Sequence, residues 1–268
     1  MRPLQAGIEE SRERAAEAAQ RRADRAALRL LKDADNVELK VTVSDADRHS
    51  AVLKLDLDVL DCDLRQVVFF DTPDLQLTGA GVVVRARRAR NGGDSVVKLR
   101  PVVAAQLPSD LRHTNGFKIE LDAMPGTLVC SGSLKARVDS ADVKEVLQGT
   151  RPIRKLFSRE QRAFYAEHAP KGLELDALTP LGPINVARTK LELDEAIGRR
   201  SVAELWFYPD GTRILELSTK CAPEEAFQLA AQMRVILTRH GINPTGEQQT
   251  KTRKTLQYFS RIRGHRYH

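Results

Sequence analysis

The stretch Val37-Glu38-Leu39-Lys40-Val41-Thr42-Val43 alternates strictly between apolar and polar residues, and this period of two is typical of a β-strand with one polar face. Similar alternation predicts further strands at 82–88, 96–100, 117–122, 187–193 and 213–220. The less regular segments 64–70 and 202–208 complete about eight strands, with a hairpin turn at Asp210-Gly211. Helices are expected at 45–54, 141–148, 151–166, 223–239 and 248–261, and loops at 101–114 and 124–135.

The composition indicates a globular protein. The 268 residues are 41% hydrophobic and 29% charged, and no apolar run approaches the roughly 18 residues of a membrane span. The first thirty residues lack the apolar core of a signal peptide, and the three cysteines are too scattered for a disulfide framework or a CxxC metal site. We therefore expect a cytoplasmic protein with reduced thiols and no membrane partner.

The N-terminal segment reads as a helix over residues 9–34, because alanines recur there every four residues without an intervening Gly or Pro. This pattern divides the chain into a helical extension, 1–35, and a main domain, 36–268. An alanine stripe buries little area, so the extension is expected to pack on the main domain or on a second copy of the chain in a homodimer.

The net charge of +7 is not spread over the chain. The segment from Arg239 onward holds seven basic residues and one acid, so the rest is almost neutral. A basic tail at 250–266 with Tyr258 and Phe259 leaves nucleic-acid binding open as one alternative. The near-neutral body disfavours it, because nucleic-acid-binding domains usually carry a broad basic surface.

The polar faces of the predicted strands are rich in charges at two-residue spacing. They supply nine basic residues, which are Lys40, Arg85, Arg87, Lys98, Arg100, Lys118, Arg188, Lys190 and Lys220. They also supply five acidic residues, which are Glu38, Glu120, Asp122, Glu192 and Glu216. A solvent-exposed sheet face usually carries more Ser and Thr. The high density of charged residues on these faces therefore needs a specific structural reason.

Two architectures accommodate these charged faces. An antiparallel sheet of eight strands can close into a barrel, and inward-facing charges would then line a polar bore that needs compensating ligands. A multiply charged phosphate anion and a divalent cation held by carboxylates would satisfy them. The alternative is an open sheet with one solvated face and interstrand ion pairs, each worth about 0.2–1 kcal/mol.

One block of sequence resembles a known family. Phe69-Phe70-Asp71-Thr72-Pro73-Asp74, followed by Leu77 and by Gly81-Val82-Val83-Val84-Arg85-Ala86-Arg87, is similar to the strand–turn–strand of the CYTH superfamily, the triphosphate tunnel metalloenzymes. Asn36-Val37-Glu38-Leu39-Lys40 takes the place of the family's ExExK, and Glu216-Leu217-Ser218 that of its later ExE. The resemblance extends over about 36–260. It implies an α+β fold in which an eight-stranded antiparallel β-barrel closes around a charged tunnel and helices surround it.

The resemblance also implies roles for individual residues. A divalent metal, Mg²⁺ or Mn²⁺, would be bound by Glu38, Glu120, Asp122 and Glu216, and the catalytic residues would be Glu38, Glu216 and Lys40. The phosphates would be bound by Lys40, Arg85, Arg87, Lys98, Lys118, Arg188, Lys190, Lys220 and Lys251. Asn36 and Ser218 stand where the family has metal-binding carboxylates, so the resemblance implies weakened metal binding.

Two functions within this fold follow from the resemblance. The first is metal-dependent hydrolysis of tripolyphosphate or an organic triphosphate, with adenylate cyclase activity the less favoured variant. The second, motivated by Asn36 and Ser218, is a tunnel that binds polyphosphate or a nucleotide without turnover. We expect Asp71 to cap the following turn, and Trp206 and Tyr208 to pack, rather than to take part in chemistry.

Overall fold

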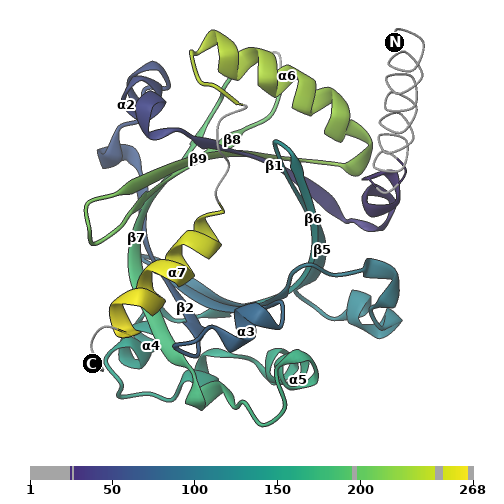
Figure 1. The fold of residues 1–268 in the computed structure, drawn as a ribbon, viewed down its shortest axis with the longest axis vertical. Coiled ribbons are helices and arrows are strands. Elements are labelled where there is room, and N and C mark those ends of the chain that lie inside the picture. The colour runs from purple at the N-terminus through teal and green to yellow at the C-terminus, as the bar shows by residue number, and fades with distance from the viewer. Residues whose placement is uncertain (1–24, 26, 195–197, 245–249, 265–268) are drawn as a thin grey trace, which may run out of the picture.

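Nine strands of the described chain close into a single β-barrel. The computed structural model describes residues 25, 27–194, 198–244 and 250–264. The barrel order is β1-β5-β6-β4-β3-β2-β7-β8-β9, and Figure 1 shows the strands as a ring. The strands are β1 (Asn36–Val43), β2 (Asp63–Asp71), β3 (Val82–Ala89), β4 (Gly92–Leu99), β5 (Phe117–Met124), β6 (Thr127–Val138), β7 (Thr179–Leu191), β8 (Ser201–Phe207) and β9 (Arg213–Cys221).

The closed α+β barrel confirms the predicted architecture, but the count of eight strands and the purely antiparallel pairing are wrong. The additional strand is β6, which lies in the predicted loop 124–135 and pairs with both β4 and β5. Its centre, Ser131-Gly132-Ser133, consists of small residues that weaken the alternating pattern. One pair of neighbours, β1 and β5, is parallel, and its register places Glu38 opposite Asp122.

Except for the last, the helices of the described chain cover the outside of the barrel. Their bounds are α2 (Asp45–Lys54), α3 (Gln76–Gly79), α4 (Ser140–Leu147), α5 (Arg159–His168), α6 (Ala226–Arg239) and α7 (Lys251–Gly264), with short 3₁₀ turns between them. In Figure 1, α6 covers one side near β1, β8 and β9, and α4 and α5 lie on the opposite side. The predicted N-terminal helix, 9–34, lies mostly outside the described residues, although residues 27–33 are helical.

Two separate apolar clusters show which face of each strand points inward. The larger joins the outward residues of the strands, such as Val37, Val84 and Leu217, to the covering helices. The smaller joins inward residues, such as Val67, Phe69 and Trp206, to Leu256 and Phe259 of α7. Helix α7 therefore fills part of the barrel interior, in agreement with its position inside the ring in Figure 1. We call the remaining interior the lumen.

The Phe69–Asp74 block has a structural role. Asp71 is buried, and its carboxylate accepts hydrogen bonds from the backbone N–H groups of Thr72, Leu77 and Thr78 at 2.7–3.0 Å. It thereby ties the end of β2 to α3, as expected from the sequence. No helix in the described part of the chain is long and apolar enough to span a bilayer.

Candidate functional site

The strand alternation places the sequence-predicted site residues on the inward faces of the barrel. Register and burial give this orientation for Glu38 and Lys40 on β1, for Arg85 and Arg87 on β3, and for the corresponding residues of the other strands. The remaining inward residues from the predicted set are Lys98, Lys118, Glu120, Asp122, Arg188, Lys190, Glu216 and Lys220. Lys251 enters the lumen from the first turn of α7. The barrel therefore brings all of them into one lumen.

Asp122 is the centre of one group of paired charges. Its buried carboxylate accepts hydrogen bonds from Lys40 Nζ at 2.6 Å, Lys98 Nζ at 3.3 Å and Arg100 Nη1 at 2.6 Å. Lys40 Nζ also lies 3.1 Å from Glu38 Oε2. We call Glu38, Lys40, Lys98, Arg100 and Asp122 the paired cluster, because each of its three cations contacts a carboxylate.

The pKa values in the paired cluster reflect these contacts. Burial alone would raise the pKa of Asp122, but Lys40, Lys98 and Arg100 hold it far below its usual value. Burial opposes the charge on Lys40, yet Glu38 and Asp122 raise its pKa above the usual value. Lys40 and Asp122 are therefore both charged at neutral pH.

The outer part of the lumen holds more exposed charges. Lys220 Nζ lies 2.5 Å from Glu120 Oε1, and the Lys220 side chain is about half exposed. Lys118 and Lys190 are exposed. Because exposed charges are screened by solvent, these three lysines interact only weakly with neighbouring charges.

Glu204 on β8 is a lumen carboxylate that the sequence analysis missed. It lies opposite Glu216 in the β8–β9 register, and Lys251 contacts both carboxylates, with Nζ 2.6 Å from Glu216 Oε1. Burial would raise the pKa of Glu204, but Lys251 lowers it to about 2. The sequence does contain the alternation that would place Glu204 on the inward face, since Glu204 and Trp206 alternate with Ala203 and Leu205. The apolar Trp206 made this face look less polar than it is.

The neighbouring part of the lumen carries four arginines, which we call the arginine cluster: Arg65, Arg85, Arg87 and Arg188. They come from the adjacent strands β2, β3 and β7. Arg65 was not predicted, because its segment alternates poorly. Arg87 pairs with Asp94, with Nη2 2.9 Å from Oδ2, and Arg188 Nε lies 3.9 Å from Glu204 Oε1.

Arg85 differs from its neighbours in lacking a carboxylate partner. Within the described residues no ion pair involves Arg85, and its buried Nε has no hydrogen-bond acceptor. Burial, and then the charge of Arg87, lower its pKa to about 10, which still leaves the guanidinium protonated at neutral pH. Burial and the neighbouring Arg188 and Arg87 also lower the pKa of Arg65. Arg65 Nη2 lies 3.8 Å from Asp63 Oδ2, so the other three arginines each have a carboxylate nearby. Arg85 thus carries the positive charge of the cluster that no described carboxylate pairs with.

The donors present do not fit the metal site that the resemblance implies. In the part of the chain that the structure describes, no group of three or more acidic, His or Cys side chains converges. Each of the four predicted ligands faces a cation: Glu38 and Asp122 contact Lys40, Glu120 contacts Lys220, and Glu216 contacts Lys251. One lumen oxygen without a partner, Asn36 Oδ1, is an uncharged amide. Lysine ammonium groups hold the carboxylates that a divalent ion would need.

The C-terminal segment does not present its aromatic residues to a nucleic acid. Phe259 is buried in the inner apolar cluster, and the Tyr258 ring packs edge-on against Tyr208 and Phe259. Lys251 is turned into the lumen. The features that favoured a nucleic-acid-binding tail therefore serve to seat α7 in the barrel.

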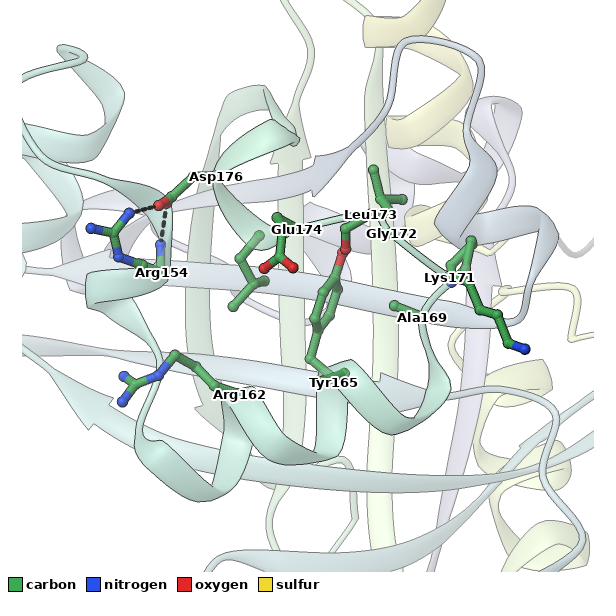
Figure 2. A pocket seen from close by; sticks show the side chains of 12 residues that line it. Arg154, Arg162, Tyr165, Ala169, Lys171, Gly172, Leu173, Glu174 and Asp176 are labelled. Carbon is green, nitrogen blue, oxygen red and sulfur yellow. Dashed lines mark hydrogen bonds and ion pairs between the residues drawn. The ribbon is translucent and has the colours of Figure 1, made fainter.

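A surface pocket of about 170 Å³ lies outside the barrel, along α5 and the segment that follows it (Figure 2). Its polar groups bind one another: Arg154 pairs with Asp176, and Tyr165 Oη donates to the Leu173 carbonyl at 2.9 Å. No lumen residue lines this pocket. The candidate site is therefore the lumen.

Comparisons with known proteins agree on the fold. No protein-family model matches the sequence, and neither does any curated protein. Among solved structures, the chain resembles a protein from Bacillus halodurans described as a "putative adenylate cyclase", with a TM-score of 0.54 and 16% identity over 81% of this chain and 96% of the other. It also resembles a "putative adenylyl cyclase" from Hippeastrum, reported to have a dominant triphosphatase activity, with a TM-score of 0.56 and 15% identity over 79% and 91%.

These likenesses define the class of fold. Both matches span most of each chain, so the whole barrel is shared rather than one motif. The chain therefore shares the closed-barrel fold of these two proteins, and a closed barrel is what the sequence resemblance predicted.

Proposed function

We propose that this protein binds a multiply charged phosphate anion, of the size of tripolyphosphate or the triphosphate group of an organic molecule, in the lumen of its barrel. The observation that carries the proposal is the arginine cluster, where the Nε of Arg85 is buried and the guanidinium is ionised without a carboxylate partner among the described residues. A buried uncompensated cation is costly, and a phosphate oxygen that accepts its hydrogen bonds removes that cost.

The geometry of the cluster suits an anion with several phosphates. Arg65, Arg85, Arg87 and Arg188 come from three neighbouring strands, so their guanidinium groups can bind successive phosphoryl oxygens. The exposed Lys118 and Lys190 would raise the local concentration of such an anion. The shared fold supports the proposal, since a protein with this fold from Hippeastrum is reported to be a triphosphatase.

Titration calorimetry with tripolyphosphate tests this function. The wild-type protein is expected to bind tripolyphosphate more tightly than orthophosphate, and Arg85→Glu is expected to abolish binding, because it replaces an attraction with a repulsion. The matched control is Arg88→Glu, which makes the same change three positions further along β3, on the other face of the strand. Equal binding by the wild type and a folded Arg85→Glu variant would show that the arginine cluster is not the site.

Hydrolysis of the bound anion is a second candidate, favoured by the register of β1 and β5. That register sets Glu38 beside Asp122, and Lys40 contacts both. Phosphate release from tripolyphosphate, thiamine triphosphate or nucleoside triphosphates, measured with Mg²⁺ and with Mn²⁺, decides between turnover and binding alone. Formation of cyclic AMP from ATP in the same panel tests the cyclase variant. Binding without any product would leave the first proposal in place and remove the second.

A further inference from the structure

Lys251 lies in a polar cage inside the lumen. Its Nζ contacts Glu204 and lies 2.6 Å from Glu216 Oε1, and it sits 5.2 Å from the centre of the Trp206 ring. The three charged side chains are at most 16% exposed. The ammonium group is thus enclosed by two carboxylates and an aromatic face.

Several elements combine to build this cage. Glu204 and Glu216 lie directly opposite each other on β8 and β9, where two like charges repel unless a cation separates them. Trp206 Nε1 donates to Glu204 at 3.3 Å and fixes that carboxylate. Thr255 Oγ1 bonds both the Lys251 carbonyl, at 2.7 Å, and Tyr208 Oη, at 2.9 Å, and so anchors the first turn of α7. The position of Lys251 is therefore fixed by packing as well as by charge.

Two adjacent carboxylates without Lys251 would be a good site for a hard divalent cation, which prefers several anionic oxygens. With Lys251 in place, their oxygens are occupied by an ammonium group. The same arrangement recurs in the paired cluster, where Lys40 lies between Glu38 and Asp122. Lysine therefore takes the place of a metal ion at two points of one lumen.

We propose that Lys251 is a built-in substitute for a divalent cation: it occupies the space between Glu204 and Glu216, excludes Mg²⁺ and Mn²⁺ from them, and makes the charge of the lumen independent of dissolved metal. This consequence rests on the proposed function: with Lys251 in this role, the protein binds tripolyphosphate without a metal ion.

Calorimetric titration with Mn²⁺, in the absence of any phosphate, tests the role of Lys251. Lys251→Met is expected to bind Mn²⁺ at least about tenfold more tightly than the wild type, because it frees two carboxylates without adding a charge. The gain should disappear when Glu216→Gln is added. The matched control is Lys254→Met, which removes a lysine one turn further along α7 that lies over Tyr208, 5.1 Å from its ring centre; it should bind Mn²⁺ as the wild type does.

Wild-type protein that binds Mn²⁺ as tightly as Lys251→Met would overturn the proposal, as would a folded Lys251→Met with no gain. Circular dichroism establishes folding, and Lys251→Gln, which keeps a polar side chain, serves if the Met variant does not fold. Tripolyphosphate titrations of the wild type with Mg²⁺ and with EDTA should give equal affinities, and a requirement for Mg²⁺ would contradict the proposal. Absence of tripolyphosphate binding under both conditions would refute the proposed function, while the Mn²⁺ titration would still decide the role of Lys251.

Discussion

The two charged regions of the lumen, the paired cluster and the arginine cluster, differ in how far carboxylates pair with their cations. In the paired cluster, Lys40, Lys98 and Arg100 converge on the buried Asp122. In the arginine cluster, Arg85 is partly buried, its Nε fully so, but it has no carboxylate partner among the described residues. The paired cluster therefore contributes to holding the barrel closed, whereas the arginine cluster is where we propose that the ligand binds. The number of basic residues in each region does not distinguish the two clusters. The positions of the carboxylates distinguish them.

The largest expected effect comes from breaking the paired cluster at Asp122. Asp122→Asn removes the charge that three cations share, and loss of one partner in a buried ion pair costs about 3–5 kcal/mol of unfolding free energy. Urea unfolding at neutral pH measures this loss. The control is Glu120→Gln, which breaks a pair with the half-exposed Lys220 and should cost about 1 kcal/mol or less. Equal losses for the two variants would contradict a central role for Asp122.

The second effect concerns acid stability and depends on Glu204. Its pKa is lowered from 4.5 to about 2 in the folded protein, so it contributes stability that is present above pH 4.5 and is lost as the pH falls toward 2. The contribution is roughly 2–3 kcal/mol at neutral pH. Urea unfolding between neutral pH and pH 3 should show a shallower decline for Glu204→Gln than for the wild type. Parallel declines would show that Glu204 is not held by Lys251 in solution.

The third prediction concerns the charge of the arginine cluster, which becomes more positive when a neighbouring carboxylate is removed. Asp94 pairs with Arg87 and lies 3.5 Å from Lys135 Nζ, so Asp94→Asn releases positive charge toward the lumen. The affinity for tripolyphosphate should rise by roughly three- to tenfold, equivalent to about 1 kcal/mol. Titration calorimetry measures the change. Weaker binding by this variant would indicate that Asp94 positions Arg87 for the ligand rather than competing with it.

The smallest effects are expected at the exposed lysines. Lys118→Met and Lys190→Met should each change the affinity for tripolyphosphate by less than about fivefold, because exposed charges are worth about 1 kcal/mol or less. Their main effect should be on the association rate at low ionic strength, where long-range attraction is strongest. Stopped-flow binding at two salt concentrations separates the rate from the affinity. A large loss of affinity would move the binding site toward the exposed part of the lumen.

Much of the fold could be predicted from the sequence, because a strand with one charged face shows a clear alternation of apolar and charged residues. Seven of the predicted strands and the Asp210-Gly211 turn recur with small shifts of boundary, and β7 begins well before its predicted start. Pro180 and Pro183 concealed the first half of β7, since proline is unfavourable within strands. Strand β6 escaped detection for a related reason, because Ser131-Gly132-Ser133 carries little hydrophobic signal. A barrel can include such segments because pairing on both sides supplies their hydrogen bonds.

The sequence predicted most residues of the candidate site, but not which cation contacts which carboxylate. The two-residue spacing of Arg85 and Arg87 was enough to place them on one face. Which carboxylate meets which cation depends on register across the barrel, as when Lys98 of β4 reaches Asp122 of β5 past the intervening β6. Lys251 approaches Glu204 and Glu216 only because α7 enters the lumen. Sequence spacing does not contain these long-range contacts.

The central claim is that the charge of Arg85 serves a ligand rather than the fold, and urea unfolding of Arg85→Met with and without tripolyphosphate tests it directly. Without the anion, Arg85→Met should be at least as stable as the wild type, because it removes a buried cation that has no partner. A ligand at a hundredfold excess over its Kd should stabilise the wild type by about 2.7 kcal/mol, and the variant far less. A variant that is less stable alone yet gains as much from tripolyphosphate as the wild type would contradict the claim.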